Sequence, residues 1–457
     1  MERLKTLFKK LTKKEYLPFW FFAGVQLIYH WMMREGPGTD AMWFFRNQLD
    51  AYSLKDYLTI RYHGWSSRLV IEAALVYVSR HMRLYKLLDW GMWMLLACSL
   101  SAVFGKTKDK ARTNWVLVGL LLIYPLAELG GAGWIATTTN YIWPLALGVF
   151  VLTGTARVLR GERVAWWMHI LYLPAMIYAA NAEQMCAVLL GIEGLCFLWI
   201  LFVKKQGKQV LVLAPYLLIG LAEFLFILKC PGNAARKNEE IANYLQNYEM
   251  YNLVDKADLG FVDTMKHLIS SGNLLFFAFT LVLAVLVFLR MKGFMERFVS
   301  LIPVCITAVL TFLGDSFSEH YAKLASVLEK NEIINGYNYV WGYSYLPFVL
   351  YLLVLLCILV SLAWVAGSWE EFLFCFFLLA IGLASRVVMG FSPTIFVSES
   401  RTFLYLYMTI AVTAAALIEW HDTEWKEHPK AAQAIGLAGA CMLVISLFGG
   451  FMAASAI

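Results

Sequence analysis

The sequence predicts an all-α protein, a polytopic bundle of transmembrane helices. Hydrophobic residues make up 60% of the 457-residue chain and charged residues 15%, whereas a soluble globular protein carries roughly 25% charged residues. The mean hydropathy is +0.63, and a soluble protein of this size has too little interior to hide so much apolar surface. Long apolar runs recur along the whole chain, and short basic segments separate many of them. We therefore expect one integral membrane domain covering residues 1–457, with the lipid bilayer as its partner.

Charge and cysteine content exclude several other classes of protein. The chain has 38 Lys and Arg against 32 Asp and Glu, a net charge of +6, too weak and scattered to indicate a nucleic-acid partner. Most of the 8 cysteines lie inside apolar runs and no CxxC pair occurs. Neither a disulfide framework nor a zinc site is therefore predicted.

The N-terminal segment predicts how the chain is oriented. The segment MERLKTLFKKLTKKEY is strongly basic, and the apolar run from Leu17 to Met33 follows it. REGPGTD comes next, and it lacks the small-residue cleavage site of a signal peptide. We expect an uncleaved first helix with a cytoplasmic N-terminus, as the positive-inside rule requires.

Crossing the hydrocarbon takes about 20 residues, and on this criterion the sequence predicts about 13 spans, within a range of about 11 to 13. The expected spans lie near residues 17–33, 86–104, 114–127, 141–156, 164–180, 184–203, 209–229, 271–290, 298–314, 346–366, 371–389, 401–419 and 432–455.

The loops between these spans differ on the two sides of the membrane. The loops expected in the cytoplasm are short and mostly basic: GKTKDKAR, ARVLRGER, VKKQGK, RMKGFMER and WHDTEWKEHPK. The acidic turn at Trp369–Glu371 is the exception. The longer loops fall on the outer side, at residues 34–85, 128–140, 230–270, 315–345 and 390–400. This pattern places a multi-pass protein in the cytoplasmic (inner) membrane, with its outer side carrying the longer loops.

Two outer loops carry stretches with helical spacing of apolar residues interrupted by charges. The stretch from Trp65 to Tyr85 in the first outer loop predicts an amphipathic helix at the membrane interface. A more polar helix is expected over residues 236–248 in the fourth outer loop.

Unusual polar residues gather at the outer ends of the spans. Asp40 follows a Gly-Pro-Gly turn and is either a helix N-cap or a functional carboxylate near the membrane surface. Arg68 ends the segment YHGWSSR and either reaches lipid headgroups or holds a phosphate. Glu183, in NAEQ between two spans, lies at a depth where ionisable groups usually face a cavity or a partner.

Further polar clusters fall on the same side. The segment TTTNYIWP contains Asn140, Tyr141 and Trp143; an aromatic belt explains the two rings, but the hydroxyls and the amide suit binding of a polyol. The remaining candidates come from the segments CPGNAAR, GDSFSEH and SESR, and they are Asn233, Arg236, Asp315, Glu319, His320 and Arg401. His320 by itself is more typical of a histidine at the membrane interface than of a catalytic base. Together the clusters predict an outer cavity for an anionic headgroup and a polar partner.

This arrangement resembles the GT-C class of membrane glycosyltransferases, and more narrowly a bacterial family of GT-C-like multispan proteins. The resemblance covers about residues 16–405 and rests on TDAMWF, WSSR, TTTNYIWP, NAEQ, CPGNAAR and SPTIFVSESR. It implies hexosyl or pentosyl transfer, with inversion, from a polyprenyl-phosphate-linked donor to an envelope glycan or lipid acceptor on the outer face. It also implies a carrier synthase and a flippase as partners.

The resemblance assigns roles to particular residues. Asp40 would be the general base, and Arg68, Arg236 and Arg401 would bind the donor phosphate. The sugar and acceptor would be contacted by Asn140, Tyr141, Trp143, Glu183, Asn233, Asp315, Glu319 and His320. GT-C enzymes often show paired acids, whereas here Ala41 and Met42 follow Asp40. The resemblance therefore implies no required cofactor, and it leaves open whether the activity depends on a divalent metal.

Other classes of membrane protein share some of these features. A polysaccharide polymerase or ligase also has large outer loops and arginines. A transporter or flippase of lipid-linked sugars would be expected to show inverted repeats and broken helices at the midplane, and no repeat is visible. A structural subunit would bear the energetic cost of many polar groups at membrane depth although it has no substrate for them to bind.

Overall fold

The computed structural model describes residues 12–329, 338, 340–398 and 400–456. Over these residues the chain is 83% helical and forms no strand, which confirms the all-α prediction. The helices divide into two compact units, each described by itself. Unit 1 comprises residues 1–122, 126–239 and 447–457, and unit 2 comprises residues 123–125 and 240–446.

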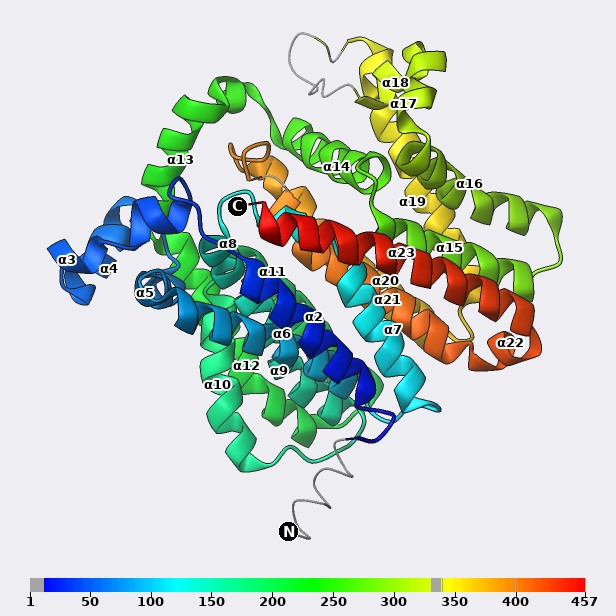
Figure 1. The fold of residues 1–457 in the computed structure, drawn as a ribbon, viewed down its shortest axis with the longest axis horizontal. Helices are drawn as coiled ribbons and strands as arrows, with labels where there is room; N and C mark the ends of the chain where they lie inside the picture. The colour runs from blue at the N-terminus through cyan, green and yellow to red at the C-terminus, as the bar shows by residue number, and fades with distance from the viewer. Residues whose placement is uncertain (1–11, 330–337, 339, 399, 457) are drawn as a thin grey trace. The chain divides into compact units, whose positions relative to one another are not determined.

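Unit 1 is built around α6, α9, α10, α11 and α12, which pack against one another, while α2 packs on α6 (Figure 1). Its elements are α2 (Leu17–Met32), η1 (Ala41–Phe45), α3 (Gln48–Ala51), α4 (Leu54–Gly64), α5 (Leu69–Val78), α6 (Met82–Phe104), α7 (Lys110–Ile123), η2 (Leu126–Leu129), α8 (Trp134–Asn140), α9 (Ile142–Leu159), α10 (Trp166–Ala180), α11 (Glu183–Leu198), η3 (Trp199–Val203), α12 (Gly207–Lys229) and α13 (Pro231–Tyr244).

Unit 2 is built around α15, which packs on α16, α19 and α21, while α20 packs on α21 and α14. Its elements are η4 (Gln246–Met250), α14 (Leu253–Ser270), α15 (Leu274–Arg290), α16 (Phe294–Phe312), α17 (Gly314–His320), α18 (Ala322–Glu329), η5 (Gly342–Tyr345), α19 (Leu346–Val365), α20 (Trp369–Val387), η6 (Val388–Phe391), η7 (Ser400–Phe403), α21 (Leu404–Trp420), α22 (Asp422–Glu427) and α23 (Pro429–Ser455), the last ending in unit 1.

Many helices are long and apolar enough to cross a membrane. Among the described residues there are 9 such helical segments, or up to 10 if α14 and α15, bent by 81° at a short break, make one span. The chain is therefore a multi-pass membrane protein by length and composition of its helices. Three predicted spans correspond to the shorter helices α2, α7 and α10, of 16, 14 and 15 residues.

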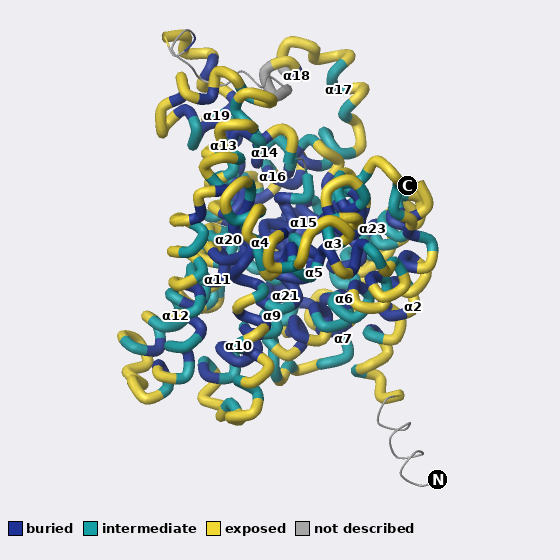
Figure 2. The backbone as a smooth tube through the Cα atoms, turned by 90° about the vertical axis from the view of Figure 1, so that its left-hand side faces the viewer, coloured by how far each residue is buried: buried dark blue, intermediate teal, exposed yellow. Residues whose placement is uncertain are grey.

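The exposed side of α12 shows why lipid must surround unit 1. Leu211, Leu218 and Leu225 recur every seven residues and are 72%, 65% and 53% exposed. The opposite side of α12 is buried through Leu213 and Tyr216. Figure 2 shows the same division of exposed and buried backbone along α12. Water would disfavour so continuous an apolar stripe, whereas hydrocarbon does not.

The structure changes the prediction for the first outer loop. The stretch from Trp65 to Tyr85 is not one helix, because α5 ends at Val78 and α6 begins at Met82. His81, at φ −129° and ψ 72°, breaks the helix between them. One side of α5 is buried through Ile71, Leu75 and Val76, while Val70 and Tyr77 are exposed, so its place at the membrane interface stays a prediction. The expected helix over residues 236–248 is α13, which begins at Pro231 and ends at Tyr244.

Candidate functional site

The candidate site of unit 1 starts at the turn between α4 and α5. The Ser66 hydroxyl accepts the Arg68 backbone N–H at 3.1 Å. The Asn181 side-chain oxygen accepts the N–H groups of Val70 and Ile71, at 3.0 and 3.2 Å. Asn181 thereby satisfies amides of the first turn of α5, which would otherwise lack partners, and fixes the backbone that carries Arg68.

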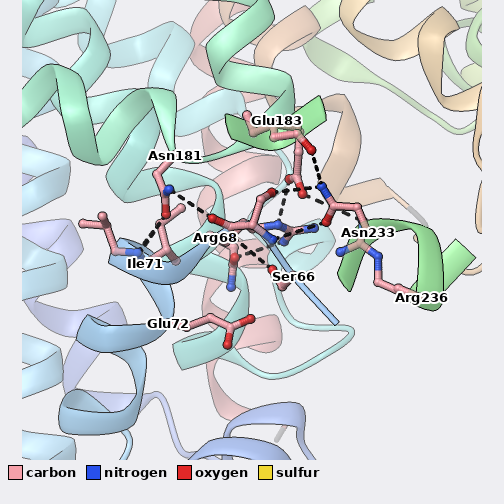
Figure 3. Close-up of polar contacts among 12 residues, drawn as sticks. Ser66, Arg68, Ile71, Glu72, Asn181, Glu183, Asn233 and Arg236 are labelled. Carbon is pink, nitrogen blue, oxygen red and sulfur yellow. Dashed lines mark hydrogen bonds and ion pairs between the residues drawn. The ribbon is translucent and has the colours of Figure 1, made fainter. Parts of the chain in front are cut away.

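Two arginines share one carboxylate at this turn (Figure 3). Arg68 Nε lies 2.7 Å from Glu183 Oε2, and Arg236 Nη2 lies 3.8 Å from Glu183 Oε1. Arg68 directly precedes α5, Glu183 begins α11 and Arg236 lies in α13, and the three side chains are 24%, 28% and 21% exposed. They are therefore ordered by one another and still accessible to a ligand.

Asn140 holds the other side of the Arg68 guanidinium. Arg68 Nη1 donates to Asn140 Oδ1 at 3.0 Å, and Asn140 Nδ2 donates to the Ala136 carbonyl at 2.8 Å. Asn140 is the last residue of α8, and Tyr141 lies next to it between α8 and α9. Tyr141 is close enough to Arg68 to interact electrostatically.

The start of α13 is fixed against the same turn. Asn233 accepts the Ser67 N–H at 3.3 Å and donates to the Ser67 hydroxyl at 3.2 Å. Gly232 allows this approach, because a Cβ there would lie 2.6 Å from the backbone of Trp65 and of Tyr62. Arg236, one turn further along α13, is thereby directed at Glu183.

The electrostatics of this cluster favour an anion. α5, α11 and α13 all begin here, and helix N-termini carry partial positive charge. The two arginines and Glu183 leave one net positive charge. Burial by itself lowers the pKa of the Arg68 guanidinium, but the Glu183 carboxylate raises it above its ordinary value. Arg68 therefore stays charged, and the cluster could hold a phosphate or carboxylate oxygen.

Asp40 lies on a loop that is docked against the residues just before α8. Its N–H donates to the Ala132 carbonyl at 3.1 Å. Glu35 Oε2 accepts the Ile135 N–H at 3.2 Å, which caps the start of α8. Gly133, at φ +92°, permits this contact, since a Cβ there would lie 2.2 Å from Glu35 Oε1. α8 therefore connects the Asp40 loop to Asn140 and Arg68, over a length of about 10 Å.

A buried polar cluster of unit 1 was missed by the sequence prediction. His30 Nε2 lies 2.8 Å from Asp89 Oδ2, and the Trp143 indole donates to Asp89 Oδ1 at 2.7 Å. All three residues are at most 4% exposed. Trp143 is thus a buried partner of Asp89 and is not placed to contact a substrate from the surface. Asp89 could have been found as a single carboxylate within the apolar run of α6.

The remaining predicted site residues belong to unit 2. Asp315, Glu319 and His320 are exposed on the short helix α17, where His320 Nδ1 bonds only within its own helix, to the Ser316 carbonyl. Arg401 lies in η7 and is partly exposed. Their assignment to a substrate site therefore stays a prediction.

The candidate site contains too few close ligands to predict a metal. No group of three or more His, Cys, Asp or Glu side chains among the described residues could hold a metal ion.

Compared with known proteins, the chain matches no family, no curated protein and no solved structure. Its function is therefore argued from the geometry of the site.

Proposed function

We propose that the chain is an inner-membrane glycosyltransferase of the GT-C class. It would move a hexosyl or pentosyl group from a polyprenyl-phosphate carrier to an envelope glycan or lipid acceptor on the outer face. The observation that carries this proposal is Glu183 held between Arg68 and Arg236 where three helices begin. This is a partly exposed cluster of donors with one net positive charge, of the kind that binds a carrier phosphate.

In the proposed reaction, Asp40 accepts the proton of the acceptor hydroxyl as its oxygen attacks the anomeric carbon. The bond from that carbon to the phosphate oxygen breaks, and the carrier phosphate leaves with the electron pair. Arg68 and Arg236 stabilise the charge that develops on this leaving group. One displacement inverts the configuration and needs no second, nucleophilic carboxylate. Asn140 and Asn233 hold the arginine cluster in place.

The proposal includes the membrane topology. Thirteen crossings, with α2, α7 and α10 as short spans, put the N-terminus in the cytoplasm and the start of α5, α11 and α13 outside. Short spans are tolerated when flanking residues reach the interface or the bilayer thins. A substrate carried on a membrane lipid would then enter from the outer leaflet.

Binding of a polyprenyl monophosphate to the purified full chain tests the anion site. We expect Arg68→Gln and Arg236→Gln each to raise Kd by about 10-fold or more, the loss expected for a charge-assisted hydrogen bond. Lys237→Gln, on the exposed side of α13, is the matched control and should leave Kd unchanged. If the arginine variants bind as the control does, the cluster is not a phosphate site.

Envelope glycans of cells with and without the gene test the reaction itself. Cells that carry Asp40→Asn should show the glycan profile of the deletion, while the purified variant should still bind the carrier. An unchanged glycan profile on deletion, with carrier binding intact, would contradict transfer and favour transport. Longer or shorter chains rather than a missing sugar would favour the polymerase or ligase class.

A further inference from the structure

A second buried glutamate on α11 has surroundings opposite to those of Glu183. Glu193 lies ten positions further along the helix, about 15 Å away, and is fully buried. Thr155 donates its hydroxyl to Glu193 Oε1 at 2.6 Å, while Oε2 has no hydrogen-bond partner. Within the described part of the chain, no cation pairs with this carboxyl.

The helices around Glu193 carry two hydrogen-bonded pairs of polar side chains. On α9, Thr153 Oγ1 lies 2.9 Å from the Tyr172 hydroxyl of α10. On α12, the Tyr216 hydroxyl lies 2.8 Å from His169 Nδ1 of α10. The Tyr172 and Tyr216 rings meet edge to face, with centroids 6.1 Å apart. Glu193 is close enough to Tyr216 to interact with it electrostatically.

The titratable groups that face Glu193 are few. Tyr216 of α12 and Cys196 of α11 interact electrostatically with Glu193, while Tyr172 and His169 of α10 contact Tyr216. α9 contributes only the neutral hydroxyls of Thr153 and Thr155, and η3, with the sequence WILFV, contributes no titratable group. No member supplies a fixed positive charge, and an ionised carboxylate without one is costly in this environment.

We propose that Glu193 is an intramembrane proton-binding site that exchanges its proton with the surface through Tyr216 and His169. Tyr216 is fully buried and interacts electrostatically with Glu193, whereas its hydrogen-bond partner His169 is partly exposed, so this pair leads from the buried carboxyl toward the surface. When the Glu193 carboxylate takes up a proton by this route, one proton moves at each step. A protonated His169 gives its proton to the Tyr216 oxygen while the hydroxyl proton of Tyr216 passes to the Glu193 carboxylate. The imidazole is left neutral and the carboxyl protonated.

Infrared spectroscopy of the full chain in lipid nanodiscs tests whether Glu193 carries the proton. A protonated carboxyl has a carbonyl stretching band that ionised carboxylates lack. We expect such a band at pH 7, lost in Glu193→Gln and kept in Glu183→Gln, because Glu183 is paired with two arginines. Identical spectra for the wild-type protein and Glu193→Gln would overturn the proposal.

Two further variants keep the test decisive if Glu193→Gln does not fold. Thr155→Val leaves the carboxyl in place but removes its hydrogen bond, so the band should shift; an unshifted band would contradict the assignment. His169→Phe should slow deuterium exchange of the band several-fold. His63→Phe, on the exposed α4, is the control. Equal exchange rates in both variants would overturn the route through His169.

Discussion

Glu35 shows how a single half-buried side chain can make this fold sensitive to pH. Burial raises the pKa of its carboxyl, and the nearby Asp40 raises it further, while hydrogen bonds from Thr39 and Ile135 lower it. The net pKa lies above the ordinary value for a glutamate. The folded state therefore binds this proton more tightly than the unfolded chain does.

The sign of the resulting pH dependence follows from linkage. As pH rises from the ordinary carboxyl pKa through the raised one, ionisation of Glu35 should destabilise the folded protein. Glu35→Gln removes this ionisation and can still accept the Ile135 N–H. We expect its thermal unfolding temperature to match wild type under acidic conditions and to exceed it increasingly as pH rises through this window. A constant difference at all pH values would contradict the role given to Glu35.

At the scale of single residues, the sequence predicts Arg68, Glu183 and Arg236 as candidate site residues, but not the ion pairs between them. Glu183 is predicted because ionisable groups at membrane depth are costly, and Arg68 is predicted because an arginine there can hold a phosphate. That they meet one another depends on the packing of α5, α11 and α13, which no local pattern encodes. The same limitation hid His30, whose partner Asp89 is 59 positions away.

At the scale of elements, the junction of α13 with the turn before α5 depends on a glycine. Gly232→Ala would place a Cβ 2.6 to 2.7 Å from backbone atoms of Tyr62, Trp65 and Ser66. Backbone cannot move aside as a flexible side chain can, so α13 must shift and carry Arg236 away from Glu183.

We expect Gly232→Ala to lower stability by about 1–3 kcal/mol, as overpacking usually does, and to weaken binding of polyprenyl monophosphate. Thermal unfolding and the carrier-binding assay measure the two effects. Gly64→Ala is the matched control, because nothing lies within 4 Å of the Cβ it would add. Equal stability and binding in the two variants would show that the close approach does not position the site.

The prediction and the structure differ mainly in where helices begin and end. A helix lies at each predicted apolar run, because hydrophobicity acts over a whole segment, but among the described residues only 9 or 10 helical segments are long and apolar enough to cross a membrane. The break between α5 and α6 depends instead on the backbone conformation of His81 within a stretch of good helix-forming residues. Such a break is favoured by tertiary packing of α5, and helical periodicity cannot reveal it.

At the scale of the whole molecule, the number of crossings can be tested by labelling. In a cysteine-free background, single cysteines replace exposed residues outside the predicted spans and react with a membrane-impermeant maleimide on intact spheroplasts. We expect Lys55→Cys and Asn238→Cys to be labelled from outside, and Lys106→Cys, Glu162→Cys and Gln206→Cys to be protected.

The three protected positions test whether α7 and α10 each cross the membrane. If α7 does not span, residue 162 falls on the opposite side from residue 106. If α10 alone does not span, residue 206 changes side while residue 162 does not. Permeabilised cells control for reactivity, since all five cysteines should then be labelled.

Glu183, held between Arg68 and Arg236, also affects how a reaction at this site would end. A carboxylate tethered beside its binding partners acts as a competitor at high effective concentration. Every incoming phosphate must displace it, and every departing phosphate is helped out by its return. The spent carrier, a phosphate monoester, carries about −1.5 to −2 charges at neutral pH and would otherwise bind more tightly than the singly charged donor. The glutamate would thus hasten product release. It would lower the affinity for the donor and raise the turnover rate.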